Sequence, residues 1–189
     1  FIGRAVCAEA EAAGHRVVRF VRPSSPRHGA GATIDWDPDS GRIDAAALES
    51  VDVVIHLAGE GIAEKRWTAD QKRRIVDSRT AGTRLIADTL AALDSPTVLL
   101  SGSAVGFYGD TGSDAVDEAS PPGSGFLTDV VTAWEAATEP ASGAGLRVAH
   151  LRTGVVYDPH GGALARQLPF FRMGLGGKVL PGTQYIPWI

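Results

Sequence analysis

Strand-length apolar runs alternate with amphipathic helical segments along most of this chain, and several runs end in small residues. The most constraining run is residues 51–57, a continuous stretch rich in β-branched side chains that stops at Ala58 and Gly59. A strand without polar alternation is typical of a parallel sheet covered on both faces. Helices between such strands predict right-handed crossovers. We therefore expect an α/β fold with a Rossmann-like, doubly wound parallel sheet.

The individual elements are predicted from periodicity and from turn and capping signals. Helices are expected at 5–13, 45–48, 68–93 and 125–141, the third opened by a capping box from Thr68 to Gln71. Strands are expected at 16–21, 33–36, 51–57, 97–100 and 147–151. After about residue 157, glycine and proline become dense and the alternation fades. A second, smaller unit is expected to begin there.

Composition and charge exclude several classes of partner. The formal net charge is −4 with acidic and basic residues interspersed, which gives no basic track for nucleic acid. The apolar runs are too short to cross a bilayer. Cys7 is the sole cysteine and the five histidines lack ligand spacing, so neither a disulfide framework nor a metal site is expected. These features favour a cytoplasmic protein with a small-molecule substrate, and they leave its oligomeric state open.

Both ends of the sequence look like cuts through structured protein. It opens on Phe1 and Ile2 without an initiator methionine, and it closes in the apolar run 185–189. We therefore expect a first strand upstream of residue 1. The remainder of a substrate region is expected downstream of residue 189.

Small or polar residues follow several expected strands, where doubly wound sheets bind their ligands. The motifs are Phe1-Ile2-Gly3, His56-Leu57-Ala58-Gly59, Ser101-Gly102-Ser103 with Tyr108-Gly109, and RTGVVYDP at 152–159. Their order resembles the extended short-chain dehydrogenase/reductases of the NAD(P)-dependent epimerase/dehydratase superfamily. The resemblance implies a set of cofactor-binding residues: Phe1, Ile2, Gly3, Leu57, Ala58, Gly59, Ser101, Gly102, Arg152 and Thr153. Within the first motif, Gly3 would be the last fingerprint glycine, which allows a helix to pack closely on a strand.

A narrower set of motifs is similar to the nucleoside-diphosphate-sugar epimerase-like subgroup, sometimes labelled a cell-division inhibitor. The set comprises AGEGI (58–62), RWT (66–68), DSR (77–79), SAVGFYGD (103–110), AWEA (133–136) and RTG (152–154). The resemblance runs from residue 1 to 189. It implies an NAD(P)-binding domain at 1–157, incomplete at its N-terminus, and the beginning of a substrate-binding region at 158–189.

Three residues of this subgroup pattern are expected to face the substrate: Glu60, Trp67 and Arg79. Each has a simpler alternative. Glu60 would otherwise be a solvated loop carboxylate, Trp67 would pack beneath the cofactor loop, and Arg79 would form a surface ion pair.

The choice of cofactor depends on the residue after the second strand of the complete sheet. NAD sites usually place an acidic side chain there to accept hydrogen bonds from the ribose. This sequence has Arg22, with Ser24, Ser25 and Arg27 nearby. A permanently charged, forked guanidinium suits a 2′-phosphate. NADP is therefore expected and NAD is less favoured, with an exposed loop residue as the alternative reading of Arg22.

The usual catalytic pair of the dehydrogenases is absent. A Tyr-x-x-x-Lys motif would place its two functional residues at Leu127 and Val131, neither of which can transfer a proton. The expected helix at 125–141 contains no tyrosine and no lysine. Ordinary tyrosine-assisted hydride transfer is therefore in doubt, whereas dinucleotide binding is unaffected.

Substitute catalytic residues are Ser103, which would polarise a substrate oxygen, and Tyr108, which would carry the proton. Asp129 and Glu60 are the carboxylates that could replace Tyr108. Ser103 could instead cap the strand end, and Tyr108 could pack beneath its loop. The leading hypothesis is NADP-dependent oxidoreductase or epimerase chemistry on a small hydroxyl- or carbonyl-bearing molecule, such as a nucleotide sugar. The alternative is an NADP-binding sensor or scaffold without turnover.

Overall fold

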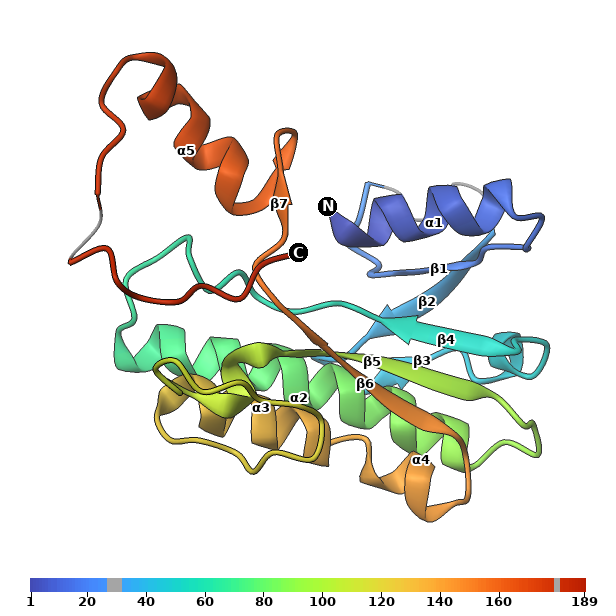
Figure 1. The fold of residues 1–189 in the computed structure, drawn as a ribbon. Helices are drawn as coiled ribbons and strands as arrows, with labels where there is room; N and C mark the ends of the chain where they lie inside the picture. The colour runs from blue at the N-terminus through green and yellow to red at the C-terminus, as the bar shows by residue number, and fades with distance from the viewer. Residues whose placement is uncertain (27–31, 179–180) are drawn as a thin grey trace. The chain divides into compact units, whose positions relative to one another are not determined.

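The computed structural model describes residues 1–26, 32–178 and 181–189, and Figure 1 labels its elements. Its helices are α1 (Ile2–Ala12), α2 (Ala69–Ala91), α3 (Phe126–Ala136), α4 (Glu139–Gly143) and α5 (Gly162–Arg172), with short 3-10 helices η1 (Ala46–Leu48) and η2 (Val105–Tyr108). Its strands are β1 (Arg19–Val21), β2 (Thr33–Asp37), β3 (Arg42–Ile43), β4 (Val53–His56), β5 (Val98–Ala104), β6 (Val148–Thr153) and β7 (Tyr157–Asp158). Strands and helices alternate as the sequence predicts, in a mixed α/β fold with parallel strand pairs.

The chain divides into two compact units. The first, here called the sheet unit, comprises residues 2–103 and 132–151. The second unit comprises residue 1, residues 104–131 and residues 152–189. The expected domain boundary after residue 157 stays a prediction.

Two three-stranded sheets form in the order β1-β2-β3 and β4-β5-β6. β1 pairs with β2 in parallel, and β2 turns back to pair with β3 antiparallel. β4 pairs with β5 in parallel, with His56 opposite Ser101. This register places the carboxyl end of β4 beside Ser101, and β5 continues for three more residues to Ala104.

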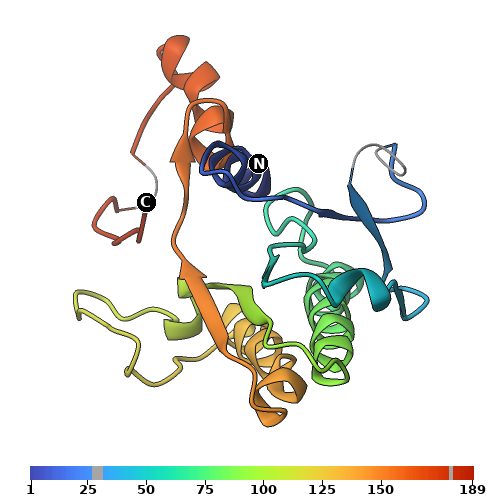
Figure 2. The same cartoon turned by 90° about the vertical axis from the view of Figure 1, so that its right-hand side faces the viewer.

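Helix α2 forms the main packing partner of the sheet unit. Its Ile75, Ile86 and Leu90 side chains are buried, and they recur at helical spacing on one face. The core they join also contains Leu48 and Leu99. α2 lies beneath β4 and β5 in Figure 1, and α4 packs beside it in both views (Figures 1 and 2). Burial of each such aliphatic side chain stabilises the fold by about 1.5–3 kcal/mol.

The two faces of β4 differ in their burial. Val54 and His56 point to the α2 side and are buried, whereas Val53 and Ile55 are 46% and 40% exposed. The expectation that both faces of this strand are covered is therefore wrong for the described residues. The β-branched composition correctly predicts a strand, but it does not reveal whether a second layer covers that strand. Helix α1 has no buried residue.

The structure corrects three details of the expected elements. Thr68 does cap α2, because its hydroxyl accepts from the Gln71 amide at 3.2 Å, but the Gln71 side chain donates to Glu60 instead of completing the box. β5 extends beyond the strand expected at 97–100 and ends at Ala104. The expected helix at 125–141 is broken between Ala136 and Glu139 into α3 and α4.

The second unit contains η2, the start of α3 and the segment from β7 onward. The Gly123 amide donates to the Phe107 carbonyl at 3.0 Å, which ties the loop before α3 to η2. α5 covers residues where the sequence indicated only fading alternation. In neither unit do the described helices include one that is long and apolar enough to cross a membrane.

Candidate functional site

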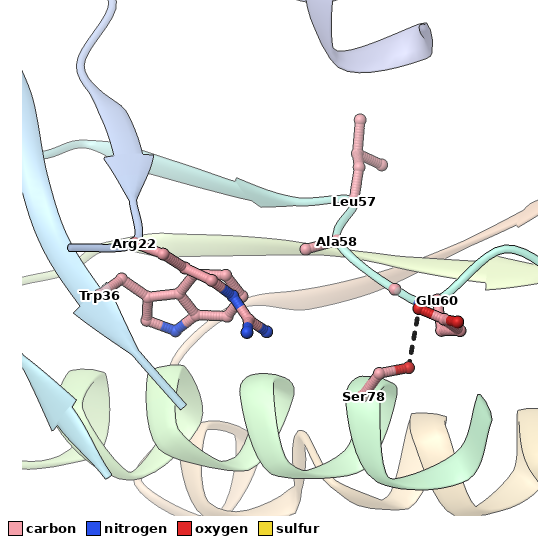
Figure 3. Close-up of a pocket in the computed structure, with 7 residues that line it drawn as sticks. Arg22, Trp36, Leu57, Ala58, Glu60 and Ser78 are labelled. Carbon is pink, nitrogen blue, oxygen red and sulfur yellow. Dashed lines mark hydrogen bonds between the residues drawn. The ribbon is translucent and has the colours of Figure 1, made fainter. Parts of the chain in front are cut away.

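A cavity of about 420 Å³ opens at the carboxyl ends of β1 and β4. Its lining residues, shown in Figure 3, are Arg22, Trp36, Leu57, Ala58, Gly59, Glu60 and Ser78. The Arg22 guanidinium lies 5.5 Å from the centre of the Trp36 ring and 2.8 Å from the Asp39 carboxylate. Both members of that ion pair are exposed, so a ligand anion can compete for the cation. Arg27 lies outside the described residues.

The turn after β4 is held in place by α2. The Glu60 amide donates to the Ser78 hydroxyl at 3.0 Å (Figure 3), and the Arg79 guanidinium donates to the Glu60 carbonyl at 3.0 Å. A Cβ on Gly59 would lie 3.2 Å from the Arg79 guanidinium carbon, so the Arg79 side chain would have to shift by a few tenths of an ångström. Leu57, Ala58 and Gly59 all line the cavity beside this turn.

Glu60 is one of the carboxylates that the sequence offers for proton transfer or substrate contact. Hydrogen bonds from Gln71 and then Lys65 lower the pKa of its carboxyl group. Its side chain is one-third exposed. Near neutral pH it is therefore an anion, which suits binding of a donor group better than service as an acid.

Arg79 and Trp134 form a support that lies behind both strand ends. The Arg79 guanidinium lies 5.2 Å from the centre of the Trp134 ring and also donates to the Ile75 carbonyl at 3.0 Å. Burial lowers the pKa of Arg79, and the nearby Glu60 charge opposes this shift. The Trp134 indole donates to Thr83 at 2.9 Å, and a Cβ on Gly102 would lie 3.0 Å from its ring.

The end of β5 is closed. Ser101 and Ser103 are buried, and the Ser103 hydroxyl donates to Oε1 of Glu135 at 2.5 Å. Glu135 Oε2 lies 3.9 Å from Nδ1 of His150 on β6. A hydroxyl that donates to a carboxylate has its oxygen polarised and ready to accept or pass on a proton.

His56, the last residue of β4, lies opposite Ser101 and is also buried. Its ring stands edge-on to Trp36 at 5.7 Å, and burial lowers its pKa to about 4. Among the described residues, neither His56 Nε2 nor Trp36 Nε1 has a hydrogen-bond partner. His56 is therefore a neutral packing residue near pH 7.

Tyr108 and Arg152 meet in the second unit. Arg152 donates to the Tyr108 phenol oxygen at 3.0 Å, and its guanidinium lies 3.6 Å from the centre of the Phe107 ring. A cation that donates to a phenol oxygen leaves the phenol hydrogen available to a second acceptor. The structure thus brings a predicted catalytic residue and a predicted cofactor residue together.

The remaining candidates lie apart from these contacts. Ile2 and Gly3 begin α1, and no atom lies within 4 Å of a Cβ placed on Gly3, so the expected close helix packing is absent among the described residues. The Phe1 ring packs against Gly161 in the second unit. The Trp67 indole donates to the Ile62 carbonyl at 2.7 Å while its ring stays 42% exposed. Their binding roles, with that of Thr153, stay predictions.

Sequence reasoning missed Glu135, His150 and Trp36 as members of these clusters. Glu135 entered the sequence analysis only as part of the AWEA family motif. No spacing rule connects Glu135 with Ser103, which lies 32 residues away. His150 lies in an expected strand, where alternation indicates packing alone. The described residues contain no group of three histidine, cysteine, aspartate or glutamate side chains that could hold a metal ion.

The model of the "NAD dependent epimerase/dehydratase family" matches residues 1–181. The chain belongs to the NAD dependent epimerase/dehydratase family. An epimerase family protein of Mycobacterium tuberculosis is 42% identical over all of this chain and 61% of its own length. The chain therefore spans about three-fifths of the length of such curated relatives.

Two solved structures of epimerase family proteins match the whole chain. The nucleoside-diphosphate sugar epimerase from Corynebacterium glutamicum has a TM-score of 0.85 at 37% identity, with 38% of its chain covered. The human epimerase family protein SDR39U1 with NADPH also has a TM-score of 0.85, at 32% identity and with 62% of its chain covered. In this epimerase/dehydratase chain, the Leu57–Glu60 turn and Ser103 occupy the carboxyl ends of parallel strands, where such folds bind ligands.

Proposed function

We propose that this chain forms the NADP-binding part of an oxidoreductase or epimerase that acts on a small hydroxyl- or carbonyl-bearing molecule, such as a nucleotide sugar. The observation that carries the proposal is the Arg22 guanidinium at the mouth of the cavity between the ends of β1 and β4. The NADPH in the structure of the human relative supports the choice of cofactor.

The residues that line the cavity fit the adenosine half of such a cofactor. Arg22 would hold the 2′-phosphate, and the backbone of Leu57, Ala58 and Gly59 would border the adenosine. Arg22 forms an exposed ion pair with the Asp39 carboxylate, and a guanidinium of this kind can exchange that partner for a phosphate. When bound, the nicotinamide would accept or return a hydride, and the chain's own side chains would orient the substrate and handle the proton.

The test is a calorimetric titration of the intact protein with NADPH and NADH. Arg22→Ala removes charge-assisted hydrogen bonds worth about 1.5–3 kcal/mol, so NADPH affinity should fall roughly 10–150-fold while NADH affinity stays nearly constant. Asp39→Asn removes the competing carboxylate and should raise NADPH affinity by up to about fivefold.

Arg42→Ala is the matched control, because Arg42 is exposed and pairs with Asp37 outside the cavity. It should change neither affinity. Equal weakening of NADPH and NADH in Arg22→Ala would contradict the assignment of a 2′-phosphate site. Failure of the wild-type protein to bind either nucleotide would overturn the proposed function.

A sensor or scaffold without turnover is the second candidate. It is favoured by the apolar residues at the usual catalytic positions, where Leu127 and Val131 pack against Gly106. Steady hydride exchange with any member of a panel of carbonyl substrates would exclude this candidate. We further propose a cytoplasmic location, which fractionation of the source cells can test.

A further inference from the structure

Trp36 lines the cavity beneath Arg22. It lies on β2, its side chain is 6% exposed, and it belongs to the residues that surround the cavity. The Arg22 guanidinium lies over the indole, 5.5 Å from the ring centre, and Figure 3 shows the Arg22 side chain extending across this ring. A guanidinium over an indole face is attracted by the electron density of the ring. The contact therefore restricts the directions in which the forked donors of Arg22 can point.

The Trp36 ring is held in place by packing. The His56 ring stands edge-on to it at 5.7 Å between ring centres, and the Phe20 ring is tilted against it at 6.2 Å. Within the described residues, Nε1 of Trp36 has no hydrogen-bond partner, so packing sets the orientation of the indole. Trp36, Arg22 and the two rings all belong to the sheet unit.

Gly82 is the position at which α2 makes room for this ring. A Cβ on Gly82 would lie 2.9 Å from Cζ2 of Trp36, which is closer than packed side chains allow. Gly82 lies inside a long helix and has no positive φ, so its own backbone conformation does not require glycine. Glycine in a helix interior lowers stability relative to alanine. An aliphatic residue at position 36 could also be buried, but it would offer Arg22 no ring face.

Arg22 has two partners, and a ligand can displace the one that is exposed. The Asp39 carboxylate lies 2.8 Å from the guanidinium, and its side chain is 78% exposed. Such a pair is weak, so a phosphate can replace the carboxylate. Trp36 is buried and stays in contact with the guanidinium when the carboxylate leaves. The ring therefore orients Arg22 both before and after an anion binds.

We propose that Trp36 is a specificity-determining residue for the 2′-phosphate of the cofactor, because it holds Arg22 at the mouth of the cavity in the space that Gly82 leaves. The inference rests on the proposed function. Arg22 would touch the phosphate, and Trp36 is a positioning residue that acts through Arg22. A purely structural Trp36 would support the whole cavity, so its loss would weaken NADPH and NADH binding equally. The ratio of the two affinities separates these roles.

The test is a calorimetric titration of the intact protein and its variants with NADPH and NADH. Trp36→Leu keeps an apolar core residue but removes the ring face, so the NADPH-to-NADH affinity ratio should fall about 2–30-fold. Trp36→Phe keeps a smaller ring and should retain most of the ratio. Gly82→Ala displaces the ring and should lower the ratio although Trp36 itself is present. Trp188→Leu, at a side chain that is 73% exposed, is the matched control and should leave the ratio unchanged.

A double variant tests whether Trp36 acts through Arg22. In the Arg22→Ala background, Trp36→Leu should have no further effect on the ratio, because both changes remove one contact. An unchanged ratio in Trp36→Leu, beside a lowered ratio in Arg22→Ala, would refute the positioning role and leave the proposed function intact. If Trp36→Leu does not fold, an unchanged ratio in Gly82→Ala overturns the inference in its place. Absence of NADPH binding in the wild-type protein would instead refute the proposed function.

Discussion

The ends of β4 and β5 lie next to each other but are built in opposite ways. The cavity beside the turn after β4 is open: the charges that line it, Arg22 and Glu60, are held in ion pairs that solvent reaches. The end of β5 is closed, with the Ser103 hydroxyl and the Glu135 carboxylate largely removed from water. Exposed charges can exchange partners when a ligand arrives, whereas buried pairs keep one geometry. The first arrangement suits recognition of an anion, and the second suits the handling of a proton.

Trp134 packs beneath Gly102 of β5 and beside Arg79, which holds the turn after β4, so its removal should disturb both strand ends. Trp134→Ala empties the space under Gly102, removes the ring beneath Arg79 and leaves Thr83 without its indole donor. We expect a loss of about 3–5 kcal/mol in the free energy of unfolding, measured by urea denaturation. Trp188→Ala, at a side chain that is 73% exposed, should cost less than about 0.5 kcal/mol. Similar small losses in both variants would show that Trp134 is no common support.

Protonation of the buried His56 ring should make the stability of the folded protein depend on pH. Burial lowers its pKa from 6.5 to about 4, so the folded protein holds the ring neutral while the unfolded chain takes up a proton near pH 6.5. The free energy of unfolding should therefore fall as pH decreases from about 6.5, by up to about 3 kcal/mol once pH 4 is passed.

The His56 effect is measured as the difference in urea unfolding between pH 7.5 and pH 5. His56→Phe keeps an aromatic ring beside Trp36 and should abolish this part of the pH dependence. His160→Gln, at a side chain that is 89% exposed, should retain it. An unchanged pH dependence in His56→Phe would mean that other groups cause it.

Arg79 provides the smallest effect and separates geometry from charge. Arg79→Lys keeps a cation but loses the forked donation to the Glu60 and Ile75 carbonyls, so we expect a loss of about 1–2 kcal/mol and weaker NADPH binding. Arg84→Lys on the same helix alters only an exposed pair with Asp88 and should change the free energy of unfolding by less than about 0.5 kcal/mol. Equal effects of the two changes would show that charge alone matters at Arg79.

Local sequence signals predict the elements of this fold well. β-branched runs predict β4 and β5, and Thr68 marks the beginning of α2 through a hydroxyl that can serve as a cap. The order of the strand-end motifs also indicates the family, because small residues are needed wherever a backbone approaches a ligand or another chain segment. Gly102 is an example, because a Cβ there would lie 3.0 Å from the Trp134 ring and 3.1 Å from the His56 carbonyl oxygen.

Burial and pairing are less predictable, since they depend on what lies opposite in space. The sequence does not reveal that Val53 and Ile55 stay exposed, or that Gln71 leaves its cap to bind Glu60. The spacing of apolar residues in a sequence indicates only which side chains share one face of a strand or helix. Whether that face is covered depends on other elements of the chain.

The sequence by itself determined the fold class, the family and the positions at which small or polar residues end the strands, because these follow from local propensity and residue order. Only the tertiary structure decided that Glu135, Thr138 and His150 gather around Ser103, and that Arg22 pairs with Asp39 at the cavity. Hydrogen bonds and ion pairs act over a few ångströms, whereas these partners lie 12 to 32 residues apart along the chain. Their meeting is a product of strand order and helix packing, which no local pattern encodes.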